Sequence, residues 1–207
     1  GFNSCGQLGL PESSEYNRQP RVVPCPGRLA QVATNQAGSH SLFRTTDGRV
    51  LVTGLNEHGQ LGTNSFTNIN RLTPMLSPTG ETFSNDTIIL MVAAGKTFSL
   101  LLDSTGRVFA VGGNDRGQLG TGLLNQRQAL PVLIDQWPVS PPPRIVHMAA
   151  GSAHSLFCDN TGRIFAVGDN SAGQLGDARG PLYAMRRTPV ELVKRWDSPG
   201  FEDGASC

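Results

Sequence analysis

Long apolar runs and an excess of charge of one sign are both missing from this 207-residue sequence. Its 17 Lys and Arg nearly balance 16 Asp and Glu, which leaves a net charge of +1. That balance argues against a nucleic-acid binder, because phosphate contacts need an excess of basic residues. The longest apolar run, Thr87 to Ala94, has the length of a strand, whereas a membrane-spanning helix needs roughly 20 residues. We therefore expect no membrane span, and the first residues show no signal peptide.

Cysteine is also scarce, and its spacing excludes the common metal motifs. Cys5, Cys25, Cys158 and Cys207 form no Cys-x-x-Cys pair and have no zinc-ligand spacing. The sequence thus predicts neither a metal site nor a bound cofactor. Four reduced thiols are typical of an intracellular protein, nuclear or cytoplasmic, and this is the compartment we expect.

Glycine and proline, by contrast, are abundant: there are 25 Gly and 14 Pro, while only 16% of the residues are charged. Disordered chains are usually highly charged and poor in apolar residues, so this composition does not suggest disorder. Many turns between short apolar runs predict an all-β protein.

An internal repeat organises the whole sequence. The phrase Gly-x-Asn-x-x-Gly-Gln-Leu-Gly begins at Gly1, Gly54, Gly112 and Gly168, so successive copies lie 53, 58 and 56 residues apart. Residues 1–207 therefore form one repeat domain, with approximate periods 1–53, 54–111, 112–167 and 168–207, the last of them incomplete. The motif positions are Gly54, Asn56, Gly59, Gln60, Leu61, Gly62, Gly112, Asn114, Gly117, Gln118, Leu119, Gly120, Gly168, Asn170, Gly173, Gln174, Leu175 and Gly176.

Two further phrases keep the same register and predict a hairpin in each period. A Gly-x-x-His-Ser-Leu phrase, with variations, recurs at 37–42, 95–100 and 151–156. In each copy this phrase leads into two short apolar segments on either side of a Gly-Arg turn, and such a pair of segments predicts two strands of a hairpin. The expected hairpins pair Ser41–Thr45 with Val50–Gly54, Ser99–Asp103 with Val108–Gly112, and Ser155–Asp159 with Ile164–Gly168.

The remaining apolar segments raise the expected number to four strands per period, as in one blade of a β-propeller. Because the hairpin strands are apolar at nearly every position, we expect their sheet to be covered on both faces. The leucine of Gln-Leu-Gly should return to the core between neighbouring sheets. The glycines and the asparagine of the motif suit backbone conformations with positive φ.

These phrases together resemble the repeat of the regulator of chromosome condensation family, and the resemblance covers essentially the whole chain. It implies a seven-bladed β-propeller, of which this sequence represents about four blades. An open partial propeller would expose unpaired sheet faces. We therefore expect the chain to be a segment of a longer protein or to be completed by other chains. A soluble monomer from a native reading frame of 207 residues would contradict this expectation.

The resemblance implies two classes of function. Most family members act as non-catalytic platforms that bind partner proteins through blade loops, some as subunits of large complexes. Others are guanine-nucleotide exchange factors for the small GTPase Ran and associate with chromatin. Exchange in those members is associated with an acidic residue and a histidine near the Gly-x-x-His phrase. His40 and His154 match that histidine, but the preceding residue is Ser39, Thr97 or Ala153 and never Asp.

No nucleophile–histidine–acid arrangement stands out, so we predict no enzyme activity and no catalytic residue. Phe98 replaces the histidine of the repeat in one copy, which favours a packing or hydrogen-bonding role for that position over proton transfer. A solvated surface is the expected setting of the C-terminal arginines, and contact with an acidic partner or with nucleic-acid phosphate is the alternative. The candidate partner-binding residues are His40, His58, His154, Asp115, Arg116, Arg179, Arg186 and Arg187.

Overall fold

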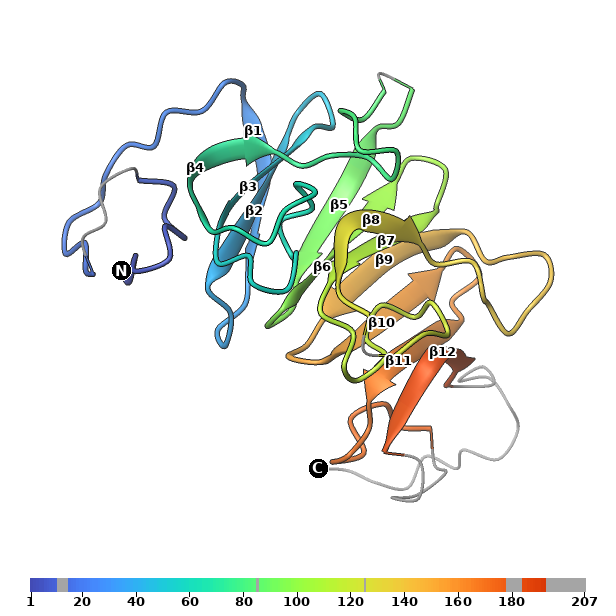
Figure 1. Cartoon of the computed structure of the whole chain (residues 1–207). Coiled ribbons are helices and arrows are strands. Elements are labelled where there is room, and N and C mark those ends of the chain that lie inside the picture. The colour runs from blue at the N-terminus through green and yellow to red at the C-terminus, as the bar shows by residue number, and fades with distance from the viewer. Residues whose placement is uncertain (11–14, 85, 125, 178–183, 193–207) are drawn as a thin grey trace, which may run out of the picture.

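The computed structural model describes residues 1–10, 15–84, 86–124, 126–177 and 184–192, and these residues form three four-stranded antiparallel sheets (Figure 1). The first sheet contains β1 (Leu29–Thr34), β2 (His40–Thr45), β3 (Val50–Gly54) and β4 (Ile69–Pro74). The second contains β5 (Ile89–Ala94), β6 (Phe98–Asp103), β7 (Val108–Gly112) and β8 (Gln128–Leu133). The third contains β9 (Ile145–Ala150), β10 (His154–Asp159), β11 (Ile164–Asp169) and β12 (Met185–Glu191).

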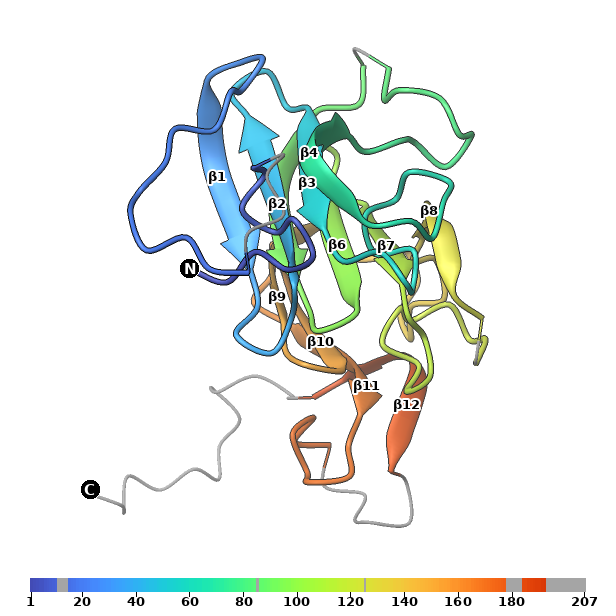
Figure 2. The same cartoon turned by 60° about the vertical axis from the view of Figure 1, so that its left-hand side comes forward.

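The three sheets follow one another in an arc, as blades of a β-propeller do (Figures 1 and 2). In each sheet the strands lie in sequence order, and the first strands of successive sheets are neighbours, since β5 contacts both β1 and β9. Strands β4, β8 and β12 form the outer edges of their sheets. The all-β propeller architecture, the four strands per period and the three hairpins predicted from the sequence are therefore confirmed.

The sheets are out of phase with the sequence periods. Strands β1, β2 and β3 come from the first period, whereas β4 lies in the second, and the other two sheets are divided in the same way. Each sheet thus takes its outer strand from the period that follows. The four motif copies correspond to three complete sheets and an N-terminal loop, in which Phe2 forms an isolated bridge with Tyr16.

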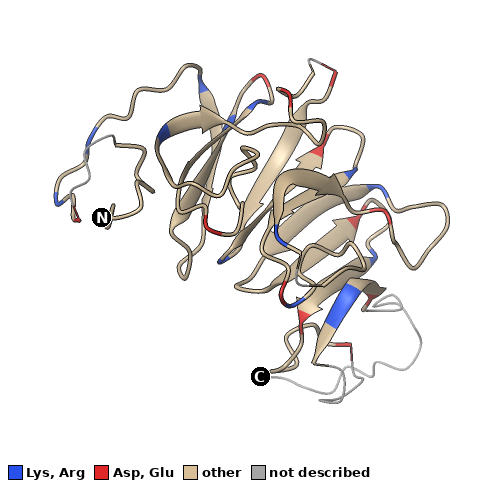
Figure 3. Cartoon of the chain, viewed as in Figure 1, with Lys and Arg blue, Asp and Glu red and all other residues tan. Residues whose placement is uncertain are grey.

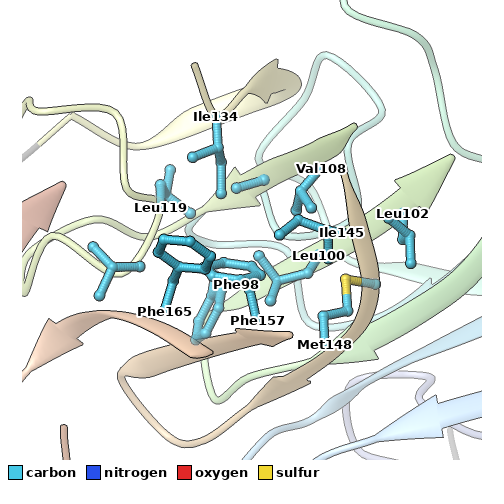
Figure 4. Close-up of a cluster of buried hydrophobic side chains, with 12 residues drawn as sticks. Phe98, Leu100, Leu102, Val108, Leu119, Ile134, Ile145, Met148, Phe157 and Phe165 are labelled. Atoms are coloured by element: carbon cyan, nitrogen blue, oxygen red, sulfur yellow. The ribbon is translucent and has the colours of Figure 1, made fainter. Parts of the chain in front are cut away.

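The core lies between successive sheets. Between the second and third sheets, Phe98, Leu119, Ile134, Phe157 and Phe165 pack together and are almost completely buried (Figure 4). A matching cluster around Leu42, Leu61 and Phe109 lies between the first and second sheets. Every residue of β3, β6 and β7 is buried, as expected for a sheet that is covered on both faces. The leucines of Gln-Leu-Gly are buried as predicted in three copies, namely Leu61, Leu119 and Leu175, whereas Leu8 of the first copy is only partly buried.

The motif asparagine acts through its side chain and not through a positive φ, so that prediction was wrong. The Asn114 side-chain oxygen accepts the backbone N–H of Leu119 at 3.1 Å, and its amide donates to the Leu123 carbonyl at 2.8 Å. The Gln118 side chain accepts the N–H of Arg116 at 2.8 Å. These bonds close the loop on itself, and the same Asn–Leu bond recurs in every motif copy.

The serine of each Gly-x-x-His-Ser-Leu phrase ties its sheet to the preceding motif loop. Ser99 donates its hydroxyl to the Gln60 carbonyl at 2.7 Å, and Ser41 and Ser155 make the equivalent bonds. A second tie joins the hairpin turn of one sheet to the first strand of the next, where the Ile89 N–H donates to the Gly48 carbonyl at 3.1 Å. The repeated phrases therefore encode the junctions between sheets as well as the sheets.

Candidate functional site

Most of the candidate residues lie at one end of the sheets, which we call the motif face. It is the end at which β2, β6 and β10 begin and β3, β7 and β11 end, so it carries all the motif loops. We call the opposite end, with the hairpin turns, the hairpin face. The candidates at the motif face are His40, His58, His154, Asp115, Arg116 and Arg187. The fold brings them to one surface, but no hydrogen bond or ion pair links any two of these six.

His40 is completely buried at the junction of the first two sheets. Its Nε2 lies 3.0 Å from the Ser99 hydroxyl oxygen. Because that hydroxyl donates its one hydrogen to the Gln60 carbonyl, the Nε2–H of His40 is the donor to Ser99. Burial lowers the pKa of His40 to about 4, although a backbone hydrogen bond at Phe98 acts in the opposite direction. His40 is thus neutral at physiological pH, and its position favours the packing role.

The burial of His40 predicts a pH dependence of stability. In the unfolded chain the imidazole protonates near pH 6.5, whereas in the folded chain it does so near pH 4. The free energy of unfolding should therefore have its full value above pH 6.5 and should fall by on the order of 3 kcal/mol as the pH drops towards 4. In His40→Phe, urea unfolding at pH 7 and pH 5 should show a smaller difference than in the wild type. The exposed His147 of β9 provides the control, and an unchanged difference in His40→Phe would contradict the assignment.

His154 occupies the equivalent position on β10 but is only partly buried, and its ring lies over Gly151. Burial lowers the pKa of His154, while the nearby Asp169 carboxylate acts to raise it. Phe98, in the second copy of the phrase, lies over Gly95 in the same manner. The position therefore holds a flat ring against a glycine in these two copies, as the phenylalanine substitution suggested.

The C-terminal arginines do not form the solvated cluster expected from the sequence. Arg186 is buried, with 9% of its surface exposed, and its guanidinium forms an ion pair with Asp177. That part of the expectation was wrong, because Arg186 lies beneath the neighbouring motif loop, whose Gly117 packs on the backbone of β12. Arg187 points to solvent as expected, and Arg179 lies outside the described residues.

Another exposed group of side chains on the motif face was not predicted from the sequence. Arg127, just before β8, places its guanidinium carbon 4.7 Å from the centre of the Phe66 ring. It also donates a hydrogen bond of 2.7 Å to the Glu57 carbonyl of the preceding sheet's motif loop. Phe66 remains 46% exposed. The only signal in the sequence was an aromatic residue within an otherwise polar loop.

Two structural tests bear on other functions. Within the described ranges, no three or more His, Cys, Asp or Glu side chains are grouped so that they could hold a metal ion. Nor does the described part of the chain contain a helix long and apolar enough to cross a membrane. Cys5, Cys25 and Cys158 are free thiols.

Comparison with known proteins extends the likeness over nearly the whole chain. Human probable E3 ubiquitin-protein ligase HERC6 is 35% identical over 194 residues, which make up 94% of this chain and 18% of that protein. Mouse protein RCC2 is 34% identical over 168 residues, or 79% of this chain and 30% of that protein. The bovine secretion-regulating guanine nucleotide exchange factor is 31% identical over 173 residues, covering 83% of this chain and 35% of that protein. The chain thus spans about a third or less of these relatives.

A solved structure and two family models agree with these relatives. Prp20p of Saccharomyces cerevisiae, studied for its binding to Gsp1p and histones, superposes with a TM-score of 0.75 at 25% identity. The superposition covers 94% of this chain and 46% of Prp20p. Residues 47–102 and 105–158 match the model of the regulator of chromosome condensation (RCC1) repeat, and residues 145–174 match a second model of that repeat. With its fold, its repeated junctions and more than half of its length matched, the chain belongs to the RCC1 repeat family.

Proposed function

We propose that this chain is a non-catalytic platform that binds partner proteins through the motif face. The observation that carries the proposal is that each motif loop contains both residues that are bonded within the protein and residues that are exposed and variable. Its asparagine, glutamine and glycines are used internally or against the next sheet, which makes the base of the loop rigid. Between these positions Glu57, Asp115, Arg116, Ser171 and Ala172 are exposed, and the residues there differ from one copy to the next. A rigid frame with variable tips is suited to selecting a partner.

The platform proposal is tested by capturing proteins on the tagged chain and mapping where they bind. We expect a captured partner, once purified, to slow amide hydrogen exchange in loops 55–68 and 113–124. Exchange in the hairpin turns serves as the internal control and should not change. Protection confined to the hairpin face, or no partner that binds the purified chain, would contradict the proposal.

A second candidate is guanine-nucleotide exchange on a small GTPase. The relation to the bovine exchange factor favours it, and so does the likeness to Prp20p, whose binding to Gsp1p has been studied. In this mechanism the propeller would bind the nucleotide-free GTPase better than the loaded one and so shift the equilibrium towards release. No catalytic residue or cofactor would be needed. Such a protein would act within the cell, in the nucleus or the cytoplasm.

Release of fluorescent GDP from a panel of small GTPases, Ran among them, separates the two candidates. If the platform proposal is right, the chain leaves the release rate at its spontaneous value. A rate that rises with chain concentration would establish exchange instead. His154→Ala and Asp169→Ala are the informative variants in that case, because both side chains lie at the motif face and the Asp169 carboxylate is close enough to act on the pKa of His154.

A further inference from the structure

Charged residues of both signs lie at the two ends of the sheets (Figure 3). At the motif face Asp169 and Asp177 are used within the chain, whereas Glu57 and Asp115 are exposed. The Asp169 carboxylate accepts hydrogen bonds from the Gln174 amide at 2.6 Å and the Ser171 hydroxyl at 3.0 Å, and Asp177 pairs with Arg186. Among the described residues of the loops and strand ends at this face, Lys96, Arg116, Arg127 and Arg187 are exposed.

At the hairpin face, arginines and buried aspartates pair with each other. Arg107 and Arg163 form ion pairs of 2.7 Å with the buried Asp103 and Asp159. The exposed charges in the described connections at this end are Arg28, Arg49, Arg107, Arg144, Asp47, Glu81, Asp86 and Asp135. Among the described residues, exposed cations therefore outnumber exposed acids at the motif face, whereas the exposed charges of the hairpin face balance.

Phe66 and Arg127 form an ordered centre within the basic end. The hydrogen bond to the Glu57 carbonyl and the stacking on Phe66 hold the guanidinium before any partner arrives. A side chain that is already ordered loses less conformational entropy on binding. Arginine and aromatic residues are also enriched among the residues that dominate the binding energy of protein interfaces.

Arg116 and Arg187 extend this centre towards the third sheet. The Cα of Arg187 lies 2.9 Å from where a Cβ on Gly117 would be, and Gly117 follows Arg116 directly. The Gly122 N–H also donates to the Arg187 carbonyl at 2.9 Å. The motif loop after β7 therefore carries its exposed arginine next to the exposed arginine of β12.

We propose that this surface, centred on Phe66 and Arg127 and extended by Arg116 and Arg187, binds an acidic polypeptide segment with an aromatic or aliphatic anchor residue. Arginine recognises carboxylates through paired N–H donors, and the exposed part of the Phe66 ring receives the anchor. Glu57 and Asp115 stand beside these arginines, which disfavours the continuous phosphate chain of a nucleic acid. The proposal rests on the platform function and names the chemistry of its partner.

The test uses the whole chain and a short fluorescent peptide of Asp and Glu around one tryptophan, titrated by fluorescence anisotropy. We expect binding that weakens with salt and falls about tenfold or more in Arg127→Glu. Phe66→Ala should weaken binding without changing its salt dependence. Arg144→Glu, an exposed change on the hairpin face, is the matched control and should bind as the wild type does. Circular dichroism spectra confirm that the variants are folded.

Several outcomes would overturn the proposal. These are no binding of the acidic peptide, equal loss in Arg144→Glu, or equal binding of a peptide in which lysine replaces the acidic residues. If a single-stranded oligonucleotide bound more tightly than the acidic peptide, the ligand of this surface would be a nucleic acid and the proposal would be wrong. A captured protein partner that binds Arg127→Glu as well as the wild type would overturn this surface but leave the platform function intact.

Discussion

Replacing Gly112 by alanine is expected to destabilise the chain by about 3 kcal/mol or more. Gly112 ends β7 with a φ of +114°, a conformation that other residues adopt only at a cost. A Cβ at this position would lie 2.4 Å from the Thr97 carbonyl oxygen and 2.7 Å from the Phe98 Cα. That carbonyl already accepts the N–H of Gly113 at 2.8 Å. Neither backbone can move without breaking the hairpin, so strain and collision add together.

Two other glycines separate these contributions. Gly173 has a φ of +75° but meets no described atom within 4 Å, so Gly173→Ala should cost only the strain, about 1 kcal/mol. Gly27 is exposed, and its Cβ would make an ordinary contact of 3.6 Å with Thr45, so Gly27→Ala should be within about 0.5 kcal/mol of the wild type. Urea unfolding, monitored by circular dichroism, ranks the three variants by their loss in free energy of unfolding. Equal losses in Gly112→Ala and Gly173→Ala would show that the collision is relieved at no cost.

Asp103→Asn should destabilise the second sheet by about 2–3 kcal/mol. The carboxylate is 1% exposed at the hairpin turn between β6 and β7. It accepts the backbone N–H groups of Thr105 and Arg107, the Thr105 hydroxyl and the Arg107 guanidinium at 2.7–3.0 Å. The asparagine amide keeps the shape of the carboxylate but removes its charge. It also places an N–H donor against one of the donors from Thr105 or Arg107. The half-exposed Arg107 can turn to water, which limits the loss.

The matched control comes from the first sheet, where the two residue types are exchanged. Thr45 takes the place of Asp103, and the carboxylate moves to Asp47, whose side chain is 57% exposed and lies 3.2 Å from Arg49. Asp47→Asn should therefore have a much smaller effect. Equal losses in the two variants would show that the buried hydrogen bonds of Asp103 contribute nothing beyond the turn itself.

The same carboxylate predicts how the chain responds to acid. Burial acts to raise the pKa of Asp103, but the hydrogen bonds from Thr105 and Arg107 outweigh it and hold the pKa below its usual value of 3.8. The contribution of the Asp103 carboxylate to the free energy of unfolding then has its full value above about pH 4 and is lost as the pH falls below that value. Asp103→Asn should flatten the stability profile in this range, below the window assigned to His40.

The strands and hairpins could be predicted because their signals are local. An apolar pair of segments around a Gly-Arg turn, such as 99–103 and 108–112, is sufficient to define a hairpin, and all three were confirmed. The phase of the sheets was not evident, because the motif Gly54 is at once the end of β3 and the start of a sequence period. The role of Asn114 was missed for a different reason. An Asn next to glycines suggests positive φ, but its side chain satisfies buried backbone groups instead.

Residues of the candidate surface were predicted only where one repeat contains the whole feature. Asp115 and Arg116 stand at an exposed loop position that the repeat itself reveals. Phe66 and Arg127 belong to different periods and meet only because the sheets stack. The ion pair of Arg186 joins β12 to Asp177 in the loop between β11 and β12, and no local pattern shows it. Partners across junctions require the three-dimensional structure.

The borrowing of every outer strand from the following period has a practical consequence for dividing this protein. A gene cut at a motif glycine, such as Gly112, would sever β8 from the sheet that β5, β6 and β7 begin, and each product would carry an unpaired edge. A cut in the connection between β8 and β9, residues 134–144, keeps both neighbouring sheets covalently whole. Shuffling of exons, or of designed modules, should therefore succeed when the boundaries lie in the connections between sheets and fail when they lie at the repeat motif.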